Sequence, residues 1–189
     1  MRQIYLIRHG NAYDKSWKQL PNSPLNKNGI EHAEAMARRF KDFKIQEVYS
    51  STMERAKDTC QTFLTYHPGV TPKYEDSLRE VVDEYFANDH DKLIYLIDKF
   101  IPIKQRVFDN FKSLVEGSKG ENVFIFTHGH FIRFVVLGIL RGDVLGFFNM
   151  NVDFASVTVV RIKDNGNLEL AVFNDCSHTN GLDYGCSWC

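Results

Sequence analysis

The chain has 189 residues, 43% hydrophobic and 25% charged, which is typical of a folded globular protein with one sizeable core. Its 23 Lys and Arg residues nearly balance its 24 Asp and Glu residues, which argues against the broad basic surface of a nucleic-acid-binding protein. No apolar stretch approaches the length of a membrane span, and no basic and apolar leader precedes the first predicted strand. We therefore expect a single domain over residues 1–189, located in the cytoplasm, with no nucleic-acid or membrane partner.

Apolar periodicity alternates between strand-like and helix-like patterns along the chain, which predicts a layered α/β fold. Gly166, between two Asn residues, predicts a hairpin that joins the last two strands. The predicted strands cover residues 3–7, 46–50, 122–127, 155–162 and 168–173.

Two helices are predicted to flank the sheet in the first half of the chain. Asn26 can cap the first, and Ser51 or Thr52 can cap the second, which runs to about Tyr66. The first helix is expected to bury the stripe Ile30, Ala33, Met36, Ala37 and Phe40.

The second half begins with a segment, Pro68 to Asp89, that is predicted to be long and loosely structured. A helical stretch then runs to Gly117, and we expect an interruption at Pro102, which lacks a backbone N–H. A further helix is predicted after His128, and its inward stripe is Ile132, Val135, Val136, Ile139 and Leu140.

The tripeptide Arg8-His9-Gly10 follows directly after the first apolar strand. Side chains at the carboxyl end of such a strand lie at the sheet edge where α/β folds bind ligands. A guanidinium binds phosphate through a planar fork and an imidazole can attack phosphorus, so the pair suits a phosphorylated substrate. The alternative is a strand-end histidine with a purely structural role.

Three further segments follow in order, and they are Ser50 to Thr59, Leu78-Arg79-Glu80 and Phe126-Thr127-His128-Gly129-His130. Together with Arg8-His9-Gly10 they resemble the histidine phosphatase superfamily, also called the phosphoglycerate mutase-like superfamily. The resemblance covers nearly the whole chain, because residues 24–29 are similar to the start of the family's first helix and residues 174–178 to the exit from its last strand. It implies a three-layer α/β/α fold with a central, mainly parallel sheet.

The resemblance also implies a role for each matched catalytic residue. His9 would be the nucleophile that becomes a transient phosphohistidine, with its other ring nitrogen held by a backbone carbonyl. Arg8 and Arg55 would clamp the phosphoryl oxygens. His128 would stand opposite His9 and donate a hydrogen bond to them. Glu80 would protonate the leaving oxygen and then deprotonate the incoming water.

Two further phosphate contacts are expected, from the backbone at Gly129 near a helix start and from Asn11. The chain departs from the family pattern after the first motif, where Ala12 and Lys15 stand in place of the usual phosphate-contacting residues. Lys15 or Asn11 can supply the contact, and the alternative for Lys15 is a solvated loop residue. His130 replaces a glycine that is frequent in the family, so it can narrow the pocket or add a donor.

Structural alternatives accompany some of these assignments. Asp83 and Glu84 are rivals for the acid role of Glu80, or they are solvated surface charges. Arg55 has the alternative of a helix-surface residue paired with neighbouring acids. Three histidines that match no motif, His32, His67 and His90, are expected at the surface.

These residues imply a metal-independent phosphatase, without a cofactor, that acts on a small phosphorylated substrate or a phosphoprotein. A phosphohistidine phosphatase is an alternative, because residues 8–12 are similar to the start of small bacterial enzymes of that kind. Those enzymes generally lack the separate acid, so Glu80 favours an ester. A mutase is less favoured, because no arginine pair lies between Glu80 and His128. A noncatalytic phosphoryl-binding protein is the remaining alternative.

The cysteines gather in a tail over about residues 176–189, which holds Cys176, Cys186 and Cys189. Together with His178 they can ligate zinc, although the spacing is loose for a known zinc module. Reduced thiols without a metal are the favoured interpretation, and a disulfide between Cys186 and Cys189 is a further alternative.

Overall fold

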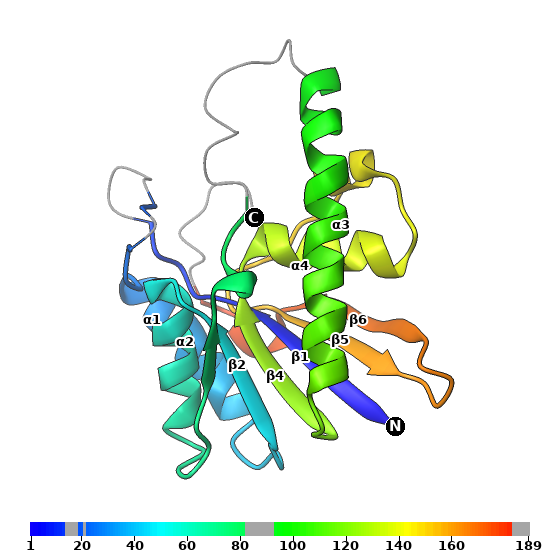
Figure 1. The fold of residues 1–189 in the computed structure, drawn as a ribbon. Coiled ribbons are helices and arrows are strands. Elements are labelled where there is room, and N and C mark those ends of the chain that lie inside the picture. The colour runs from blue at the N-terminus through cyan, green and yellow to red at the C-terminus, as the bar shows by residue number, and fades with distance from the viewer. Residues whose placement is uncertain (14–18, 21, 82–92, 183–189) are drawn as a thin grey trace.

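The computed structural model describes residues 1–13, 19–20, 22–81 and 93–182 (Figure 1). Within these residues six strands form one sheet, in the order β3-β2-β4-β1-β5-β6. The strands are β1 (Arg2–Arg8), β2 (Glu47–Ser51), β3 (Lys73–Glu75), β4 (Asn122–Thr127), β5 (Val157–Ile162) and β6 (Leu168–Asp175). The first four in sequence pair in parallel, and β5 and β6 add an antiparallel edge. The predicted mainly parallel sheet is confirmed.

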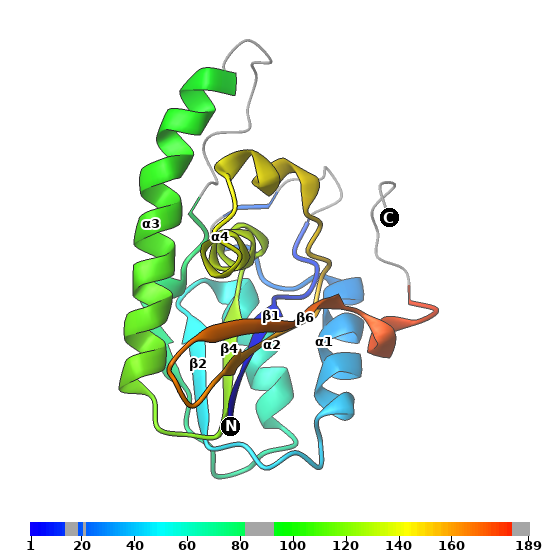
Figure 2. The ribbon, with the colours of Figure 1, turned by 90° about the vertical axis from the view of Figure 1, so that its right-hand side faces the viewer.

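Helices cover both faces of the sheet (Figures 1 and 2). One face carries α1 (Lys27–Arg39) and α2 (Glu54–Leu64), and the other carries α3 (Leu93–Gly117) and α4 (Gly129–Ile139). Alternate side chains of a strand point to opposite faces, so Tyr5 and Ile7 pack toward α1 and α2, whereas Ile4 and Leu6 pack toward α3 and α4. The predicted three-layer α/β/α architecture is therefore confirmed.

The carboxyl ends of the parallel strands meet at one edge of the sheet. Arg8 at the end of β1 pairs in register with Thr127 at the end of β4, and the last residues of β2 lie beside β4 in turn. Three of the motifs lie where these strands end: Arg8-His9-Gly10 at β1, residues 50–59 at β2 and residues 126–130 at β4. Parallel pairing alone thus brings segments more than 100 residues apart in the chain to one place.

The loop that follows β1, which contains Gly10, crosses the first turn of α1 at very short range. A Cβ atom at Gly10 would lie 2.3 Å from the carbonyl oxygen of Gly29, so neither partner of this crossing has room for a side chain. Asn26 caps α1 as predicted, because its side chain accepts the N–H of Gly29. The N–H of Asn26 in turn donates to the Asn11 carbonyl, at 2.9 Å. The loop is therefore held by backbone contacts to α1.

Three predictions about local structure are wrong. Helix α3 continues through Pro102, because Pro102 and Asp98 are exposed and the carbonyl that loses its N–H partner faces water. Residues 73–78, expected to be loose, form β3 and a short 3-10 helix, η1 (Asp76–Leu78). Helix α2 begins after Met53, since the hydroxyls of Ser51 and Thr52 bind other side chains.

Burial differs from the prediction at two stripe positions and two histidines. Ile30 is 47% exposed and Leu140 is 59% exposed, because each lies near an end of its helix where no element covers it. His32 and His67, expected at the surface, are buried against the aromatic rings of Phe154 and Phe63. His90 lies outside the described residues.

The described part of the C-terminal tail makes structural contacts. The ring of His178 binds the carbonyl of Ala155 and the guanidinium of Arg39. The thiol of Cys176 lies 3.7 Å from a carboxylate oxygen of Asp153. Within the described residues no group of three His, Cys, Asp or Glu side chains is placed to hold a metal. Cys186 and Cys189 lie outside them, so the interpretation of the tail stays a prediction, as does the single domain.

No helix in the described part of the chain is both long enough and apolar enough to cross a membrane.

The crossing of Gly10 and Gly29 yields a stability prediction. Gly10→Ala should lower the free energy of unfolding by about 3 kcal/mol, because its Cβ forces two backbone segments apart. Gly117→Ala is the matched control, since nothing lies within 4 Å of a Cβ there and alanine favours the helix. Urea unfolding of both variants measures the difference. Equal stabilities of the two variants would show that the loop after β1 moves freely away from α1.

Candidate active site

His9 follows β1 and is buried at the centre of the site. Its Nδ1 lies 2.7 Å from the Gly10 carbonyl oxygen, which accepts a hydrogen and therefore places the ring proton on Nδ1. The other nitrogen, Nε2, then carries a lone pair and accepts a hydrogen bond from Nε of Arg55 at 3.1 Å. The backbone carbonyl expected to orient this ring is thus that of Gly10.

Two arginines stand beside His9. Arg55 lies in the first turn of α2 and is completely buried, so the alternative of a helix-surface residue is wrong. Its guanidinium also donates to the Leu20 carbonyl, at 3.3 Å. Arg8, at the end of β1, donates to the Val152 carbonyl and lies 3.9 Å above the ring of Phe154. Each guanidinium is therefore held in place by protein contacts.

His128 faces His9 from the end of β4. The two ring centroids are 5.0 Å apart, and the ring of His128 is completely buried. Nε2 of His128 lies 2.8 Å from the hydroxyl of Ser51, and that hydroxyl also accepts the N–H of Met53. In the tautomer whose proton is on Nδ1, the Ser51 hydroxyl donates to Nε2. Among the described residues Nδ1 has no hydrogen-bond partner.

Glu80 reaches the site from the segment that follows η1. Thr127, at the end of β4, donates from its hydroxyl to the Leu78 carbonyl at 2.8 Å and so fixes this segment against the sheet. The Glu80 side chain is 8% exposed, and one of its oxygens, Oε1, accepts the N–H of Val81 at 3.1 Å. Nδ1 of His130 lies 3.5 Å from the same oxygen. The backbone N–H of His130 also acts on this carboxyl group.

Burial and neighbouring charges shift the pKa values of His9, His128 and Glu80. Burial is the largest cause for each of the three groups. It lowers the pKa of His9 well below the usual value, and the charges of Arg55 and Arg8 lower that pKa further. The pKa of His128 is lowered in the same way, first by burial and then by His9 and both arginines. Burial raises the pKa of Glu80, against the Val81 N–H and the arginine charges. Both rings are thus neutral at pH 7, and the Glu80 proton is held more tightly than usual.

The remaining expected site residues divide into two groups. Gly129 begins α4 directly beside Arg8, whose Nε would be 3.3 Å from a Cβ there. Asn11 is buried, and its side-chain oxygen accepts the N–H of Tyr13. Three residues weighed as alternatives, Lys15, Asp83 and Glu84, lie outside the described residues. The structure therefore brings Arg8, His9, Asn11, Arg55, Glu80, His128 and Gly129 to one edge of the sheet.

Sequence reasoning missed two contributors to the site. Ser51, expected as a candidate helix cap, instead places its hydroxyl 2.8 Å from Nε2 of His128. Arg133 lies on α4 one turn after Gly129, and the charges of Arg8 and Glu80 both act on its guanidinium. The spacing of four residues from Gly129 places the two on one helix face, which is the signal that could have identified Arg133.

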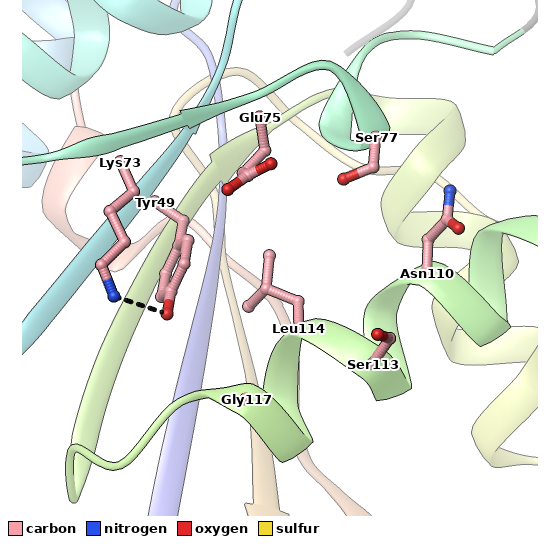
Figure 3. Close-up of a pocket in the computed structure, with 8 residues that line it drawn as sticks. All are labelled: Tyr49, Lys73, Glu75, Ser77, Asn110, Ser113, Leu114 and Gly117. Atoms are coloured by element: carbon pink, nitrogen blue, oxygen red, sulfur yellow. Dashed lines mark hydrogen bonds between the residues drawn. The ribbon is translucent and has the colours of Figure 1, made fainter.

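A separate hollow of about 360 Å³ lies between β3 and α3 (Figure 3). Polar side chains line it, among them Glu75, Ser77 and Asn110. None of the expected site residues contributes to its lining, and Lys73 at its rim is hydrogen-bonded to Tyr49. This hollow is therefore distinct from the cluster around His9.

The arrangement suits transfer of a phosphoryl group. A neutral imidazole presents a lone pair, two fixed guanidiniums provide positive charge beside it, and a buried carboxyl with a raised pKa belongs to the same cluster. A phosphoryl transfer needs a nucleophile, charge stabilisation for the equatorial oxygens and a proton for the leaving oxygen. All three functions can be assigned to groups in this cluster.

Comparison with known proteins agrees with this geometry. The family model described as histidine phosphatase superfamily (branch 1) matches residues 4–84 and 81–175. The chain is 29% identical over 186 residues to the mitochondrial serine/threonine-protein phosphatase Pgam5 of Caenorhabditis briggsae, a match that covers 94% of this chain and 64% of that protein. It is 27% identical over 209 residues to a metal-independent phosphoserine phosphatase of Arabidopsis thaliana, with 96% and 85% covered. The chain thus spans less than two thirds of the first of these relatives.

Solved structures share the fold at lower identity. A phosphoserine phosphatase of Entamoeba histolytica superposes with a TM-score of 0.78 at 18% identity, over 94% of this chain and 99% of that one. An alpha-ribazole phosphatase of Shigella flexneri gives a TM-score of 0.76 at 19% identity, over 92% and 96%. At this level of identity the likeness establishes the fold.

Because the rings of His9 and His128 are neutral in the folded protein, we predict that its free energy of unfolding decreases in acid. Because the unfolded chain protonates histidine near pH 6.5, it binds more protons than the folded state below that pH, and stability falls as pH falls. His128→Asn should reduce this slope between pH 6.5 and 5 by up to about 1.4 kcal/mol per pH unit. Urea unfolding at a series of pH values measures it.

Ser51→Ala is the control for this measurement. It removes the hydroxyl partner of His128 and lowers stability, yet it keeps the buried ring and so the slope. Parallel stability curves for the wild type and His128→Asn would contradict a His128 that stays neutral in the folded protein.

Proposed function

Because this chain belongs to the histidine phosphatase superfamily, we propose that it hydrolyses phosphomonoesters through a phosphohistidine on Nε2 of His9. One observation carries the proposal: the Gly10 carbonyl holds Nδ1, so the lone pair of Nε2 lies beside the buried guanidinium of Arg55. A phosphate dianion bound to Arg55 would draw its N–H groups away from Nε2. Substrate binding would therefore free the lone pair at the moment when phosphorus arrives next to it.

The first step forms the bond from Nε2 to phosphorus and breaks the bond from phosphorus to the ester oxygen. Glu80 gives its proton to that oxygen, so the leaving group departs as an alcohol. In the second step water attacks phosphorus, the bond from phosphorus to Nε2 breaks, and Glu80 takes the water proton. His9 and Glu80 return to their starting states, and the products are an alcohol and inorganic phosphate.

The transferred group is stabilised by positive charge and by hydrogen-bond donors. Arg8 and Arg55 are proposed to bind the equatorial oxygens through their planar forks. His128 would carry its proton on Nδ1 and donate from that nitrogen, which has no hydrogen-bond partner among the described residues. The backbone N–H groups at Gly129, where α4 begins, would add a further anion contact, and Asn11 lies near the same loop.

These groups supply the positive charge that many phosphatases take from divalent ions, so the proposed reaction needs no metal and no cofactor. Activity should accordingly persist in the presence of a chelator, and dependence on added magnesium or zinc would contradict the mechanism.

The substrate class is proposed to be a phosphate ester on a small molecule or a protein. Two relatives carry names that fit it, a phosphoserine phosphatase and a serine/threonine-protein phosphatase. A phosphohistidine substrate is the second candidate, and the buried carboxyl of Glu80 speaks against it, because a phosphoramidate leaves without a strong acid. A mutase and a noncatalytic binding protein are less favoured. The cytoplasmic location stays a prediction, since the Pgam5 relatives are named as mitochondrial.

Replacement of the nucleophile tests the chemistry directly. His9→Ala should reduce turnover of an aryl phosphate to background, because no other buried imidazole presents a lone pair to the same phosphorus. Label from a ³²P-phosphorylated substrate should appear on the wild type as an acid-labile, base-stable adduct and be absent from His9→Ala. Label that persists on the variant would move the nucleophile to another residue.

Replacement of the acid separates the two substrate classes. Glu80→Gln keeps the shape of the side chain but cannot donate a proton, so its loss of kcat should grow with the pKa of the leaving alcohol. An alkyl phosphate should lose about 100-fold or more, and an activated aryl phosphate should lose much less. A phosphohistidine peptide should hardly be affected. Equal losses on alkyl and aryl esters would remove Glu80 from the acid role.

A further inference from the structure

Ser51 is a completely buried serine at the end of β2, and its hydroxyl makes two contacts. The hydroxyl accepts the backbone N–H of Met53 at 3.2 Å, and it lies 2.8 Å from Nε2 of His128. Among the described residues no other group is hydrogen-bonded to it. The Met53 contact ties the side chain to the backbone two residues further along. The hydroxyl therefore meets His128 from a fixed position at the sheet edge.

The contact with Nε2 can form in two ways, which differ in the groups that remain without a partner. A hydroxyl has one hydrogen and two lone pairs, and the Met53 N–H takes one of the lone pairs. With the His128 proton on Nδ1, the serine hydrogen donates to Nε2, and only the Nδ1 hydrogen lacks a partner among the described residues. With the proton on Nε2, both the serine hydrogen and the Nδ1 lone pair lack one.

The arrangement with the proton on Nδ1 is therefore the more stable of the two. Each buried polar group without a partner destabilises the folded protein, and this arrangement has one such group where the other has two. The group that remains is a hydrogen-bond donor on a ring whose centroid is 5.0 Å from that of His9. An oxyanion bound beside His9 would supply the acceptor that the buried donor lacks in the described part of the chain.

We propose that Ser51 is a positioning residue: it holds His128 with its proton on Nδ1, so that this nitrogen donates to the transferred phosphoryl group. The inference rests on the proposed phosphatase activity and assigns a role to a residue that acts through His128. The opposite tautomer would present a lone pair to the negatively charged oxygens and oppose their binding. A donor directed at charge that develops in the transition state acts on kcat more than on KM.

Kinetics of two Ser51 variants test the proposal. Ser51→Ala should lower kcat by about 10- to 100-fold with KM within about threefold of the wild type, because part of the protein then lacks an oxyanion donor. The loss should be equal for alkyl and aryl phosphates, since the donor acts on the phosphoryl oxygens and not on the leaving group. Ser51→Thr retains the hydroxyl and should restore most of the rate.

Ser50→Ala is the matched control and should leave kcat near the wild-type value. Ser50 is the adjacent and equally buried serine of β2, but its hydroxyl donates to the Ser51 carbonyl rather than to His128. His128→Asn and the double variant with Ser51→Ala should lose the same kcat, because a positioning residue has no effect once His128 is replaced. Additive losses would overturn the proposal, as would a Ser50→Ala loss as large as that of Ser51→Ala.

A spectroscopic measurement keeps this result separate from the proposed function. In protein labelled with ¹⁵N-histidine, the ring signals of His128, assigned by their absence from His128→Asn, report which nitrogen carries the proton. The wild type should have the proton on Nδ1, and Ser51→Ala should move a measurable share of it to Nε2, whether or not any ester is hydrolysed. A wild-type proton on Nε2, or an unchanged tautomer in Ser51→Ala, would overturn the proposal. A changed tautomer with an unchanged kcat would overturn the role of Ser51 in the reaction.

Discussion

The hydrogen bond from Arg55 to Nε2 of His9 is the interaction on which the rest of the site depends. It places a completely buried cation against a completely buried imidazole, and it is compatible only with a neutral ring. Burial and this contact lower the pKa of His9 and keep Nε2 unprotonated at neutral pH. Arg55 is completely buried, so a phosphate dianion bound to its guanidinium would be held with little screening by water.

The fold maintains this contact with backbone constraints from three directions. Parallel pairing fixes the end of β1 against the end of β4, and so fixes His9 opposite His128. The close crossing of Gly10 and Gly29 fixes the distance between the loop after β1 and helix α1. The N–H of Gly10 donates to the hydroxyl of Thr59, which also binds the Arg55 carbonyl one turn earlier in α2. The loop that holds His9 and the helix that holds Arg55, the proposed nucleophile and phosphate clamp, are therefore joined through Thr59.

The sequence predicts the strands and the meeting of the motif residues at one sheet edge, because strand periodicity and short motifs are local properties. Arg8, His9 and His128 end strands, and the register of parallel strands brings strand ends together. Helix continuation and side-chain burial depend on residues that are distant in the sequence, so local patterns do not predict them. Pro102 is tolerated because the carbonyl it leaves unpaired faces water, and Leu140 is exposed because no element covers the end of α4. Arg133 matched no motif considered, and although its spacing from Gly129 is a local signal, the packing of α4 against Arg8 and Phe147 is what places it near the site.

Opposing influences act on Glu80, and substrate binding changes their balance. In the free protein burial raises the pKa of its carboxyl, while the charges of Arg55 and Arg8 lower it. A bound phosphate dianion neutralises those charges and adds negative charge near the carboxyl, so both effects raise the pKa of Glu80 further. In the proposed reaction the substrate thus secures the proton that it will receive. Once the alcohol has left, the carboxylate of Glu80 has gained a negative charge beside a still dianionic phosphoryl group. That repulsion favours the next step, in which Glu80 takes a proton from the attacking water.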